Sequence, residues 1–376
     1  MRTIVHLCLE SPDRGWGGLA TAVHLLAQTT AGSGIKTTVV SAEGRTRSAV
    51  DVSGYRVLVA AVPQLGARSF YESPDRLGLG STACVALLET VRAAHASDEV
   101  HIIVHNEELA PLIEWVRLER WVRTVSVVSH GLMPQEHPGR PDLHEAQRQE
   151  LASADVVFAV SRSQVNQLTS HYPDLLGVRY LPLPLSRLVR RGYSPRPKKG
   201  QFLAAGRSVP QKGFDILLRA CKLLEVDSSV SLDLVLGHGE ASYEAICRKL
   251  VAEATNPVQV HQWLGKAALL SLLAKSAAVV VPSRFEPLGL IAAEAMSLGR
   301  PVIASAVGGL PELISSPDVG VLVPASALHG PHPNDLRAGI ETMLNRGVEV
   351  TNGPELLMEK YSEDCTLAAL AHELGW

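Results

Sequence analysis

Short apolar runs alternate along this chain with segments whose apolar residues recur every three or four positions. In the first half, runs rich in Val, Ile and Leu begin at residues 3, 37, 56, 101, 124, 154 and 178. Residues 19–34 have helical spacing and end in a glycine-rich stretch. Runs that are apolar at consecutive positions are typical of strands buried on both faces of a parallel sheet. The pattern therefore predicts a parallel sheet covered by crossover helices.

The same pattern restarts after residue 200. Predicted strands are 201–207, 232–239, 258–264, 277–283, 301–307 and 320–324, and predicted helices are 215–224, 242–254, 269–276 and 289–299. Prolines and a basic cluster separate the halves. We therefore predict an α/β protein with two Rossmann-like domains, 1–185 and 201–358, a linker at 186–200, and a C-terminal segment at 359–376. Open parallel sheets bind ligands beyond the carboxyl ends of their strands, so we expect a site in a cleft between the domains.

Length and charge narrow the class of protein. The 376 residues suit two domains, and a net charge of −3 gives no overall basic field for nucleic acid. No apolar run approaches the ~20 residues of a membrane span, and the start of the chain lacks the pattern of a signal peptide. The five cysteines are scattered without a C-x-x-C motif, which indicates reduced, mostly buried thiols. We expect a cytoplasmic monomer or homodimer with no metal site, since the fourteen histidines include no H-E-x-x-H motif.

Two glutamates flank the turn between a predicted strand and the next predicted helix. Glu286 follows the strand at 277–283, and Glu294 lies eight residues later. At ~1.5 Å per residue the two backbones are ~12 Å apart along the helix axis. That exceeds the ~5–10 Å between the carboxylates of a glycoside hydrolase. The spacing suits two acids that hold opposite ends of an elongated ligand, although a surface glutamate plus a solvated helix charge explains it equally well.

Several candidate anion-binding groups lie at predicted strand ends and helix starts. Arg207 and Lys212 follow the first strand of the second half and together suit a diphosphate, although a solvated basic loop is the alternative. After Glu286, Pro287 suits the first helical position, and Leu288, Gly289 and Leu290 follow, with free backbone N–H groups at the last two. We predict a diphosphate site at this edge of the sheet.

Other candidates are glycines, aromatic residues and one histidine at strand ends. Gly17 and Gly18 open the first helix, where bare backbone favours an oxygen-rich ligand. The string from Gly15 to Ala20 formally matches a dinucleotide fingerprint, but its loop is longer than such sites use. Further candidates lie at the ends of the remaining strands. His130 follows the strand beginning at 124. Two pairs, Gly237 with Gly239 and Trp263 with Leu264, end strands of the second half at positions suited to a nucleotide base. Read singly, each of these is equally well a structural turn residue.

The order of these motifs resembles the retaining glycosyltransferases of family 4, the glycogen-synthase-like group 1 enzymes of GT-B fold. The resemblance rests on Gly17-Gly18, Ser129 to Leu132, Gly206 to Asp215, Gly237 to Gly239, Phe285 to Glu294 and Val307 to Glu312. It implies two Rossmann-like domains that face each other across a cleft. It also implies transfer of a sugar from a nucleotide sugar, UDP- or GDP-linked, to an acceptor hydroxyl, in bacterial natural-product or glycoconjugate biosynthesis.

The resemblance also assigns roles. It places Glu286 on hydroxyls of the donor sugar, Glu294 on the ribose, and Arg207 and Lys212 on the diphosphate. It places His130 beside the anomeric carbon, and Gly17 and Gly18 at the phosphate and acceptor. It implies no cofactor and no metal for chemistry, and a last helix, from Tyr361 onward, that crosses back to the first domain.

Three alternatives remain from the sequence. One is a sugar-nucleotide epimerase or phosphorylase of the same architecture, and another is a silent partner subunit. The intact set of Arg207, Lys212, Glu286 and Glu294 argues against both. Residues 115–123 mix two Trp with three Arg, which suits peripheral membrane association, but an ordinary crossover helix accounts for them.

Overall fold

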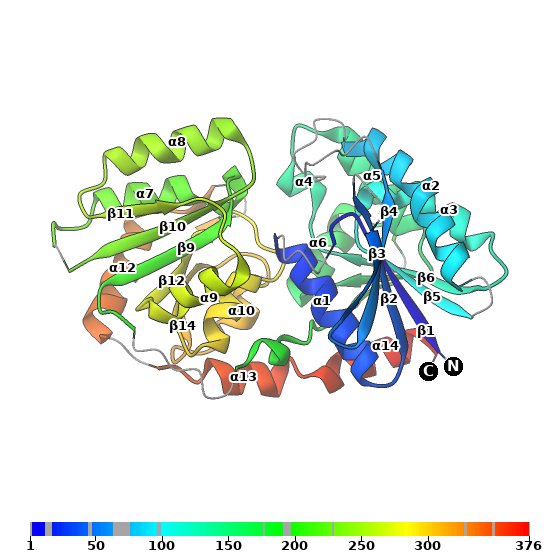
Figure 1. Cartoon of the computed structure of the whole chain (residues 1–376). Helices are drawn as coiled ribbons and strands as arrows, with labels where there is room; N and C mark the ends of the chain where they lie inside the picture. The colour runs from blue at the N-terminus through cyan, green and yellow to red at the C-terminus, as the bar shows by residue number, and fades with distance from the viewer. Residues whose placement is uncertain are drawn as a thin grey trace. The chain divides into compact units, whose positions relative to one another are not determined.

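The computed structural model of this chain contains two units, each built on its own parallel sheet (Figure 1). The first unit comprises Met1–Pro184 and Glu363–Trp376, and the second comprises Leu185–Ser362. The structure describes residues 2–11, 17–43, 47–62, 76–95, 99–175, 177–190, 197–227, 229–326, 329–347 and 350–375.

The sheet of the first unit has eight strands in the order β3-β4-β2-β1-β5-β6-β7-β8. The strands are β1 (Thr3–Cys8), β2 (Lys36–Glu43), β3 (Arg47–Val52), β4 (Tyr55–Ala61), β5 (Val100–Val104), β6 (Val122–Ser129), β7 (Val156–Ala159) and β8 (Val178–Tyr180). All neighbouring pairs are parallel except β3 and β4. The edge strand β3 was not predicted; it forms a hairpin because Ser53 and Gly54 both take positive φ, 47° and 95°, in a two-residue turn.

Helices connect and cover these strands. They are α1 (Gly17–Gly32), α2 (Arg76–His95), α3 (Ala110–Arg117), α4 (Met133–Glu136), α5 (Pro141–Ser153), α6 (Arg162–His171) and α14 (Glu363–Leu374). In one core cluster, Val23 and Ala27 of α1 pack against Val39 of β2 and Val57 of β4. Helix α14 follows the whole second unit in sequence, yet the buried hydroxyl of Thr366 donates to the Pro182 carbonyl at 2.7 Å.

The sheet of the second unit has six parallel strands in the order β11-β10-β9-β12-β13-β14. The strands are β9 (Gln201–Arg207), β10 (Ser231–Gly237), β11 (Val258–His261), β12 (Ala278–Val281), β13 (Val302–Ser305) and β14 (Gly320–Val323). The helices are α7 (Phe214–Lys222), α8 (Ala241–Ala252), α9 (Lys266–Lys275), α10 (Leu290–Ser297), α11 (Leu310–Leu313), α12 (Pro333–Arg346) and α13 (Gly353–Lys360). A small hairpin, β15 (Ala325–Ser326) and β16 (Gly330–Pro331), stands apart from the sheet. Side chains of α7, α8 and α12, such as Phe214, Tyr243 and Ile340, share one core with Phe202 and Leu234 of the strands.

The unit boundary differs from the predicted linker. Predicted strand 178–185 ends at Tyr180, because Pro182 and Pro184 lack the N–H that a sheet ladder needs. The following turn of 3₁₀ helix, η5 (Leu185–Leu188), packs on α10 and α13 and so belongs to the second unit. The second unit therefore begins at residue 185 rather than 201, and ends at 362 rather than 358.

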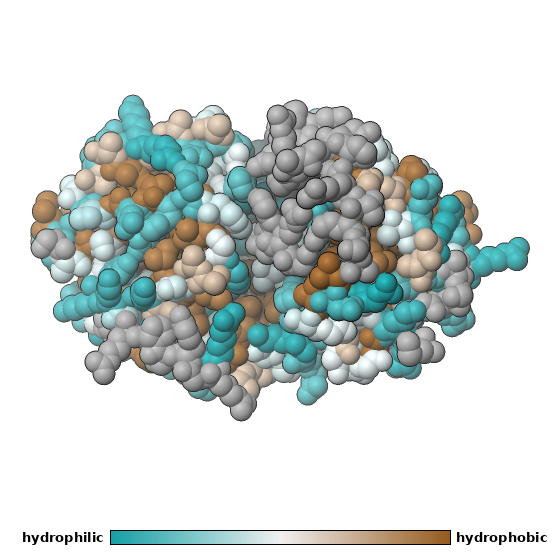
Figure 2. All heavy atoms as spheres, in the orientation of Figure 1, coloured by the Kyte–Doolittle hydropathy of each residue, from teal (hydrophilic) through white to brown (hydrophobic). Residues whose placement is uncertain are grey.

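The surface carries dispersed apolar residues. On the face that Figure 2 shows, hydrophobic residues form separate areas between hydrophilic ones. The most exposed large hydrophobic side chains are Leu118, Val226 and Val350, which lie far apart in sequence. Helix α3 connects β5 to β6 and contains residues 115–117, the first part of the stretch 115–123 that mixes Trp and Arg. Of the helices that the structure describes, none is both long enough and apolar enough to cross a bilayer.

Candidate functional site

The carboxyl edge of the second sheet brings Lys212 and Glu286 together across 74 positions of sequence. Lys212 ends the 3₁₀ turn η6 (Pro210–Lys212) after β9, and Glu286 follows β12. Lys212 Nζ donates to Glu286 Oε2 at 2.7 Å, and the Ser283 hydroxyl donates to the same oxygen at 3.1 Å. Glu286 is only 7% exposed. A buried carboxylate needs such partners, so this edge holds an ordered charged pair.

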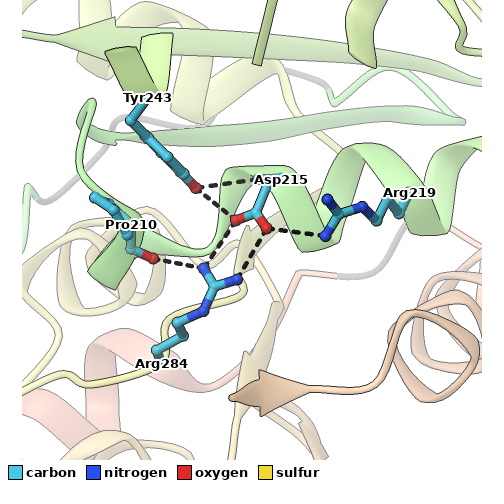
Figure 3. Close-up of polar contacts among 5 residues, drawn as sticks. All are labelled: Pro210, Asp215, Arg219, Tyr243 and Arg284. Atoms are coloured by element: carbon cyan, nitrogen blue, oxygen red, sulfur yellow. Dashed lines mark hydrogen bonds and ion pairs between the residues drawn. The ribbon is translucent and has the colours of Figure 1, made fainter. Parts of the chain in front are cut away.

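A second ion pair beside it joins Arg284 to Asp215. Figure 3 shows this pair in close-up with Pro210, Arg219 and Tyr243. Arg284 Nη1 and Nη2 donate to the two carboxylate oxygens of Asp215, each at 2.8 Å. Arg284 Nη1 also donates to the Pro210 carbonyl at 2.6 Å. The Tyr243 hydroxyl donates to Asp215 Oδ1 at 2.7 Å, and Arg219 Nη1 donates to Oδ2 at 3.1 Å. The fork of Arg284 thus links a helix, a turn and a strand end.

This Arg284 arrangement fixes the two loops that carry the lysine and the glutamate. The backbone N–H of Arg284 donates to the Gln211 carbonyl at 2.8 Å, next to Lys212. Gly213 has φ +66°, and a Cβ built there would lie 2.0 Å from the Pro282 carbonyl oxygen. The two loop backbones are therefore in contact, and only glycine fits at that position.

Asp215 is ionised although it is buried. Burial alone acts to raise the pKa of Asp215, but hydrogen bonds from Arg284 and Tyr243 and the charges of Arg284 and Arg219 outweigh it. The net result is a pKa below the ordinary value of a carboxyl group. Asp215 therefore acts as an anchor for cations rather than as an acid.

A glycine pair closes over the backbone of Glu286. The Gly309 N–H donates to the Glu286 carbonyl at 3.0 Å. Gly308 has φ +54°, and a Cβ there would lie 1.8 Å from the same carbonyl oxygen. The Val307 to Glu312 motif singled out in the sequence thus includes a packing surface for the Glu286 segment.

Glu294 lies on α10 and pairs with a residue that the sequence did not single out. Lys266, the first residue of α9, donates to Glu294 Oε1. Glu294 is 5% exposed, and its Oε2 is buried without a hydrogen-bond partner among the residues that the structure describes. The helix begins at Leu290, one residue after the predicted start of the 289–299 helix. Pro287 does not hold the first helical position, because Gly289 has φ +103° and serves as the N-cap. Pro287 and Leu288 therefore precede the helix.

The predicted base-binding residues lie where the neighbouring strands β10 and β11 end, at the carboxyl edge of the second sheet. Arg207 ends β9 and pairs in register with Gly237, the last residue of β10. A Cβ on Gly237 would lie 2.8 Å from the ring of Trp263, and a Cβ on Gly239 would lie 2.4 Å from the Ser208 carbonyl oxygen. Leu264 follows Trp263 and precedes the N-cap of α9. Arg207, Gly237 and Trp263 are thus neighbours in this unit.

His130, Gly17 and Gly18 belong to the first unit. His130 follows β6, and the loop beyond it is held by Gln164 Nε2, which donates to the Gly131 carbonyl at 3.0 Å. Burial lowers the pKa of His130 to about 4. Gly17 and Gly18 begin α1, and Gly17 has φ +82°, which favours glycine. Residues 14–16 of the predicted glycine loop lie outside the described residues.

Comparisons with known proteins agree with this geometry. Residues 188–347 match the model of the family described as Glycosyl transferases group 1. This segment is a group 1 glycosyltransferase domain. The D-inositol 3-phosphate glycosyltransferase of Thermomonospora curvata is 28% identical over 289 residues, 67% of this chain and 67% of that protein.

Two solved structures resemble the whole chain in fold. The sucrose-phosphate synthase of Thermosynechococcus elongatus superposes with a TM-score of 0.78 at 20% identity, over 98% of this chain and 97% of that one. The UDP-forming α,α-trehalose-phosphate synthase of Burkholderia xenovorans, in complex with glucose-6-phosphate, gives 0.74 at 14% identity over the whole of both chains. The predicted GT-B type of α/β fold, with two Rossmann-like parallel-sheet domains, is confirmed.

Four polar residues that hold the candidates were not predicted from the sequence. Arg284, Tyr243 and Lys266 lie beside them as described, and His105 contacts His130. Each could have been found only as a neighbour of a motif residue, because its partner lies 25 or more positions away.

Across the described ranges, no group of three or more His, Cys, Asp or Glu side chains is arranged to hold a metal ion. The cations that the described site offers to an anion are its own Arg and Lys side chains.

Proposed function

We propose that this glycosyltransferase transfers a sugar from a nucleoside-diphosphate sugar to an acceptor hydroxyl with retention of the anomeric configuration. The observation that carries the proposal is the Lys212–Glu286 pair at the carboxyl edge of the second sheet, in which the carboxylate is buried. A fixed cation beside a fixed carboxylate suits a ligand with a phosphate at one end and hydroxyl groups at the other.

The second unit supplies the donor site in this proposal. Arg207 and Lys212 neutralise the diphosphate, and Glu286 accepts hydrogen bonds from hydroxyls of the donor sugar. Glu294, whose Oε2 has no partner in the described part of the chain, accepts from the ribose hydroxyls. Gly237, Gly239, Trp263 and Leu264 border the base, and residues 287–290 lead into helix α10, whose positive end favours an anion.

The chemical step needs no nucleophile from the protein. The bond between the anomeric carbon and the phosphate oxygen breaks, and the acceptor oxygen bonds to the anomeric carbon from the same face. The acceptor proton passes to the departing phosphate oxygen, so the products are a glycosylated acceptor and a nucleoside diphosphate. The Arg207 and Lys212 charges stabilise the negative charge that develops on the leaving group. His130 contacts the sugar near the anomeric carbon, and Gly17 and Gly18 lie toward the phosphate and acceptor.

The donor is a UDP- or GDP-sugar in this proposal, and no metal or other cofactor takes part. The trehalose-phosphate synthase relative is UDP-forming and was solved with glucose-6-phosphate, and the curated relative is described as acting on D-inositol 3-phosphate. Sugar phosphates and inositol phosphates are therefore the first acceptors to test. Bacterial glycoconjugate or natural-product assembly is the setting we propose.

The first experiment is a thermal-shift screen of the full chain with UDP, GDP and ADP and their glucose and mannose conjugates. A ligand at about 100 times its Kd stabilises the folded protein by about 2.7 kcal/mol, which gives a measurable rise in Tm. The stabilising donor is then incubated with the acceptors, and the configuration of the new linkage is determined by NMR. An inverted linkage would contradict the retaining mechanism.

The matched variants Lys212→Ala and Lys222→Ala test the site. Lys222 ends helix α7 and forms an exposed pair with Glu253, so its loss should leave turnover unchanged. Lys212→Ala should lower kcat on the order of 100-fold or more while the circular dichroism spectrum stays unchanged. Full activity of Lys212→Ala would refute the site assignment.

The two alternatives give different results in the same assays. An epimerase would change the sugar of the donor without an acceptor, and a phosphorylase would require inorganic phosphate. A silent partner subunit would bind a nucleotide without turnover. None of these outcomes is compatible with acceptor-dependent release of a nucleoside diphosphate.

A further inference from the structure

Three histidines from three neighbouring strands of the first unit form a continuous hydrogen-bonded chain. His6 lies within β1, His105 follows β5 and His130 follows β6, and these strands are adjacent in the sheet. His6 Nδ1 lies 2.9 Å from His105 Nε2, and His105 Nδ1 lies 2.9 Å from His130 Nε2. Both ring pairs are stacked, with centroids 5.2 Å apart. Because these strands are parallel neighbours, the three rings lie in a row across the sheet.

The hydrogen-bonded row of histidines is buried at its His6 end and partly exposed at its His130 end. His6 is fully buried and His105 is 2% exposed, whereas His130 is partly exposed. Burial lowers the pKa of His6 to about 3 and that of His130 to about 4, and it holds the pKa of His105 well below the ordinary value. All three rings are therefore neutral near pH 7, and each carries one N–H.

Hydrogen-bond accounting selects one of two directions for these three protons. Each link requires one donor and one acceptor, so the proton position on His6 decides the positions on the other two rings. His6 Nε2 is buried with no hydrogen-bond partner in the described residues. A buried N–H without an acceptor is rarer than a buried acceptor without a donor. The proton of His6 therefore lies on Nδ1 and is donated to His105 Nε2.

The same rule then applies along the chain. His105 accepts at Nε2, so its proton lies on Nδ1 and is donated to His130 Nε2. His130 accepts at Nε2, so its own proton lies on Nδ1. The structure gives His130 Nδ1 no partner among the residues it describes. This nitrogen is left as a neutral N–H donor at the partly exposed end.

We infer that His6 and His105 are positioning residues that fix His130 as an Nδ1–H donor toward an oxygen of the nucleotide sugar. The inference rests on the proposed function for the role of His130 beside the sugar, but the proton positions follow from the first unit alone. An imidazole held in this tautomer donates to a sugar hydroxyl or phosphate oxygen and cannot act there as a general base. The hydrogen bonds among the three histidines thereby restrict His130 to binding and orienting the nucleotide sugar.

The test is the histidine tautomer, read by two-bond ¹⁵N–¹H correlation spectra of the full chain labelled with ¹⁵N-histidine. Protonated and bare ring nitrogens give distinct nitrogen shifts, so the three tautomers are assigned directly. We expect the proton on Nδ1 in all three rings. A His130 ring protonated at Nε2 in the wild-type protein would overturn the inference without any activity measurement.

Two variants, one at His6 and one at His105, separate positioning from packing. His6→Asn keeps a donor at the place of Nδ1 and should retain the His130 tautomer and turnover. His105→Leu removes the donor to His130 Nε2, so the His130 signals should shift toward the Nε2–H tautomer that a neutral imidazole ordinarily favours, and kcat should fall on the order of 10-fold with donor KM nearly unchanged. His101→Leu is the control, because His101 lies in β5 and its Nδ1 contacts Thr124 outside the chain of rings. Unaltered His130 signals in folded His105→Leu protein would also overturn the inference.

The outcomes distinguish this inference from the proposed function. If wild-type protein shows the expected tautomers but transfers no sugar, the proposed function fails and the proton arrangement stands. If it transfers sugar and the tautomers are reversed, the inference fails and the proposed function stands.

Discussion

Arg284 and Asp215 form a two-point ion pair in which both N–H···O distances are 2.8 Å. The pair joins residues 69 positions apart and lies between the segments that carry Lys212 and Glu286. Its geometry therefore supports two candidate donor-site residues that it does not contact.

Loss of this pair should lower both stability and donor turnover. Arg284→Met leaves the buried Asp215 carboxylate with fewer partners, and we expect a loss of about 3 kcal/mol in the free energy of unfolding. Arg219→Met removes a cation that is 53% exposed from the same carboxylate and should cost under about 1 kcal/mol. Urea unfolding of both variants measures the difference, and equal effects would contradict a specific role for Arg284.

The contribution of Asp215 to the free energy of unfolding should also depend on pH. The pKa of Asp215 is lower in the folded protein than in the unfolded chain, so the folded state binds the proton less readily. The stabilisation is therefore present above the ordinary carboxyl pKa of about 3.9 and is lost as the pH falls through the folded value. The difference in unfolding free energy between wild type and Asp215→Asn should shrink on acidification below about pH 4, and a constant difference would argue against it.

Glu294 should discriminate nucleotides by their ribose. Its Oε2 has no partner in the described chain, and we expect ribose hydroxyls to supply one. Glu294→Gln should weaken nucleoside-diphosphate binding by about 10-fold or more, as expected for hydrogen bonds to a charged group. The wild type should also bind the 2′,3′-dideoxy nucleotide more weakly, and the variant should not distinguish the two ligands. Titration calorimetry checks this, with Glu253→Gln as the exposed control.

Gly308 and Gly347 form a matched pair for the packing over Glu286. Both have positive φ, +54° and +81°, so alanine costs about 1–3 kcal/mol in backbone strain at either. A Cβ at Gly347 meets none of the described residues within 4 Å, whereas one at Gly308 would lie 1.8 Å from the Glu286 carbonyl oxygen. Gly308→Ala should therefore destabilise more and also weaken donor binding, while Gly347→Ala should leave donor binding intact. Equal donor affinities in the two variants would show that this contact does not position Glu286.

The buried histidines should make the first unit acid-sensitive. Their pKa values are lowered, to about 3 for His6 and about 4 for His130, so the unfolded chain binds protons that the folded state does not. Stability is therefore full above the ordinary histidine pKa of about 6.5 and falls as the pH approaches about 4, by at most about 1.4 kcal/mol per pH unit for each ring. His6→Asn should reduce this slope, which denaturant unfolding between about pH 7 and pH 4.5 would measure. An unchanged slope in that variant would contradict the expectation.

The sequence predicted the second sheet and its edge because local pattern and topology coincide there. Consecutive apolar runs fixed the strands, and the carboxyl ends of parallel strands meet at one edge. Lys212 and Glu286 each follow such a strand, so their proximity could be expected without knowing the fold in detail. Pro287 was wrongly expected at the first helical position, because Gly289 has φ +103° and caps the helix two residues later.

The support around these residues could not be predicted in the same way. Arg284 and Asp215 are adjacent to motif residues, but their pairing depends on two loop conformations. The histidine chain depends on β1 lying next to β5, which sequence order does not give. The hairpin of β3 had a weak signal in Ser53-Gly54, which a search for buried parallel strands overlooks.

Helix α14 has a consequence for the order in which the chain can fold during synthesis. The second unit is contiguous, so all of its residues emerge from the ribosome before Glu363 does. The first unit begins earlier but lacks the Thr366 contact to Pro182 until α14 has been made. We therefore expect the second unit to complete its fold first during translation, and a chain stopped at residue 362 to leave the first unit without the α14 contact.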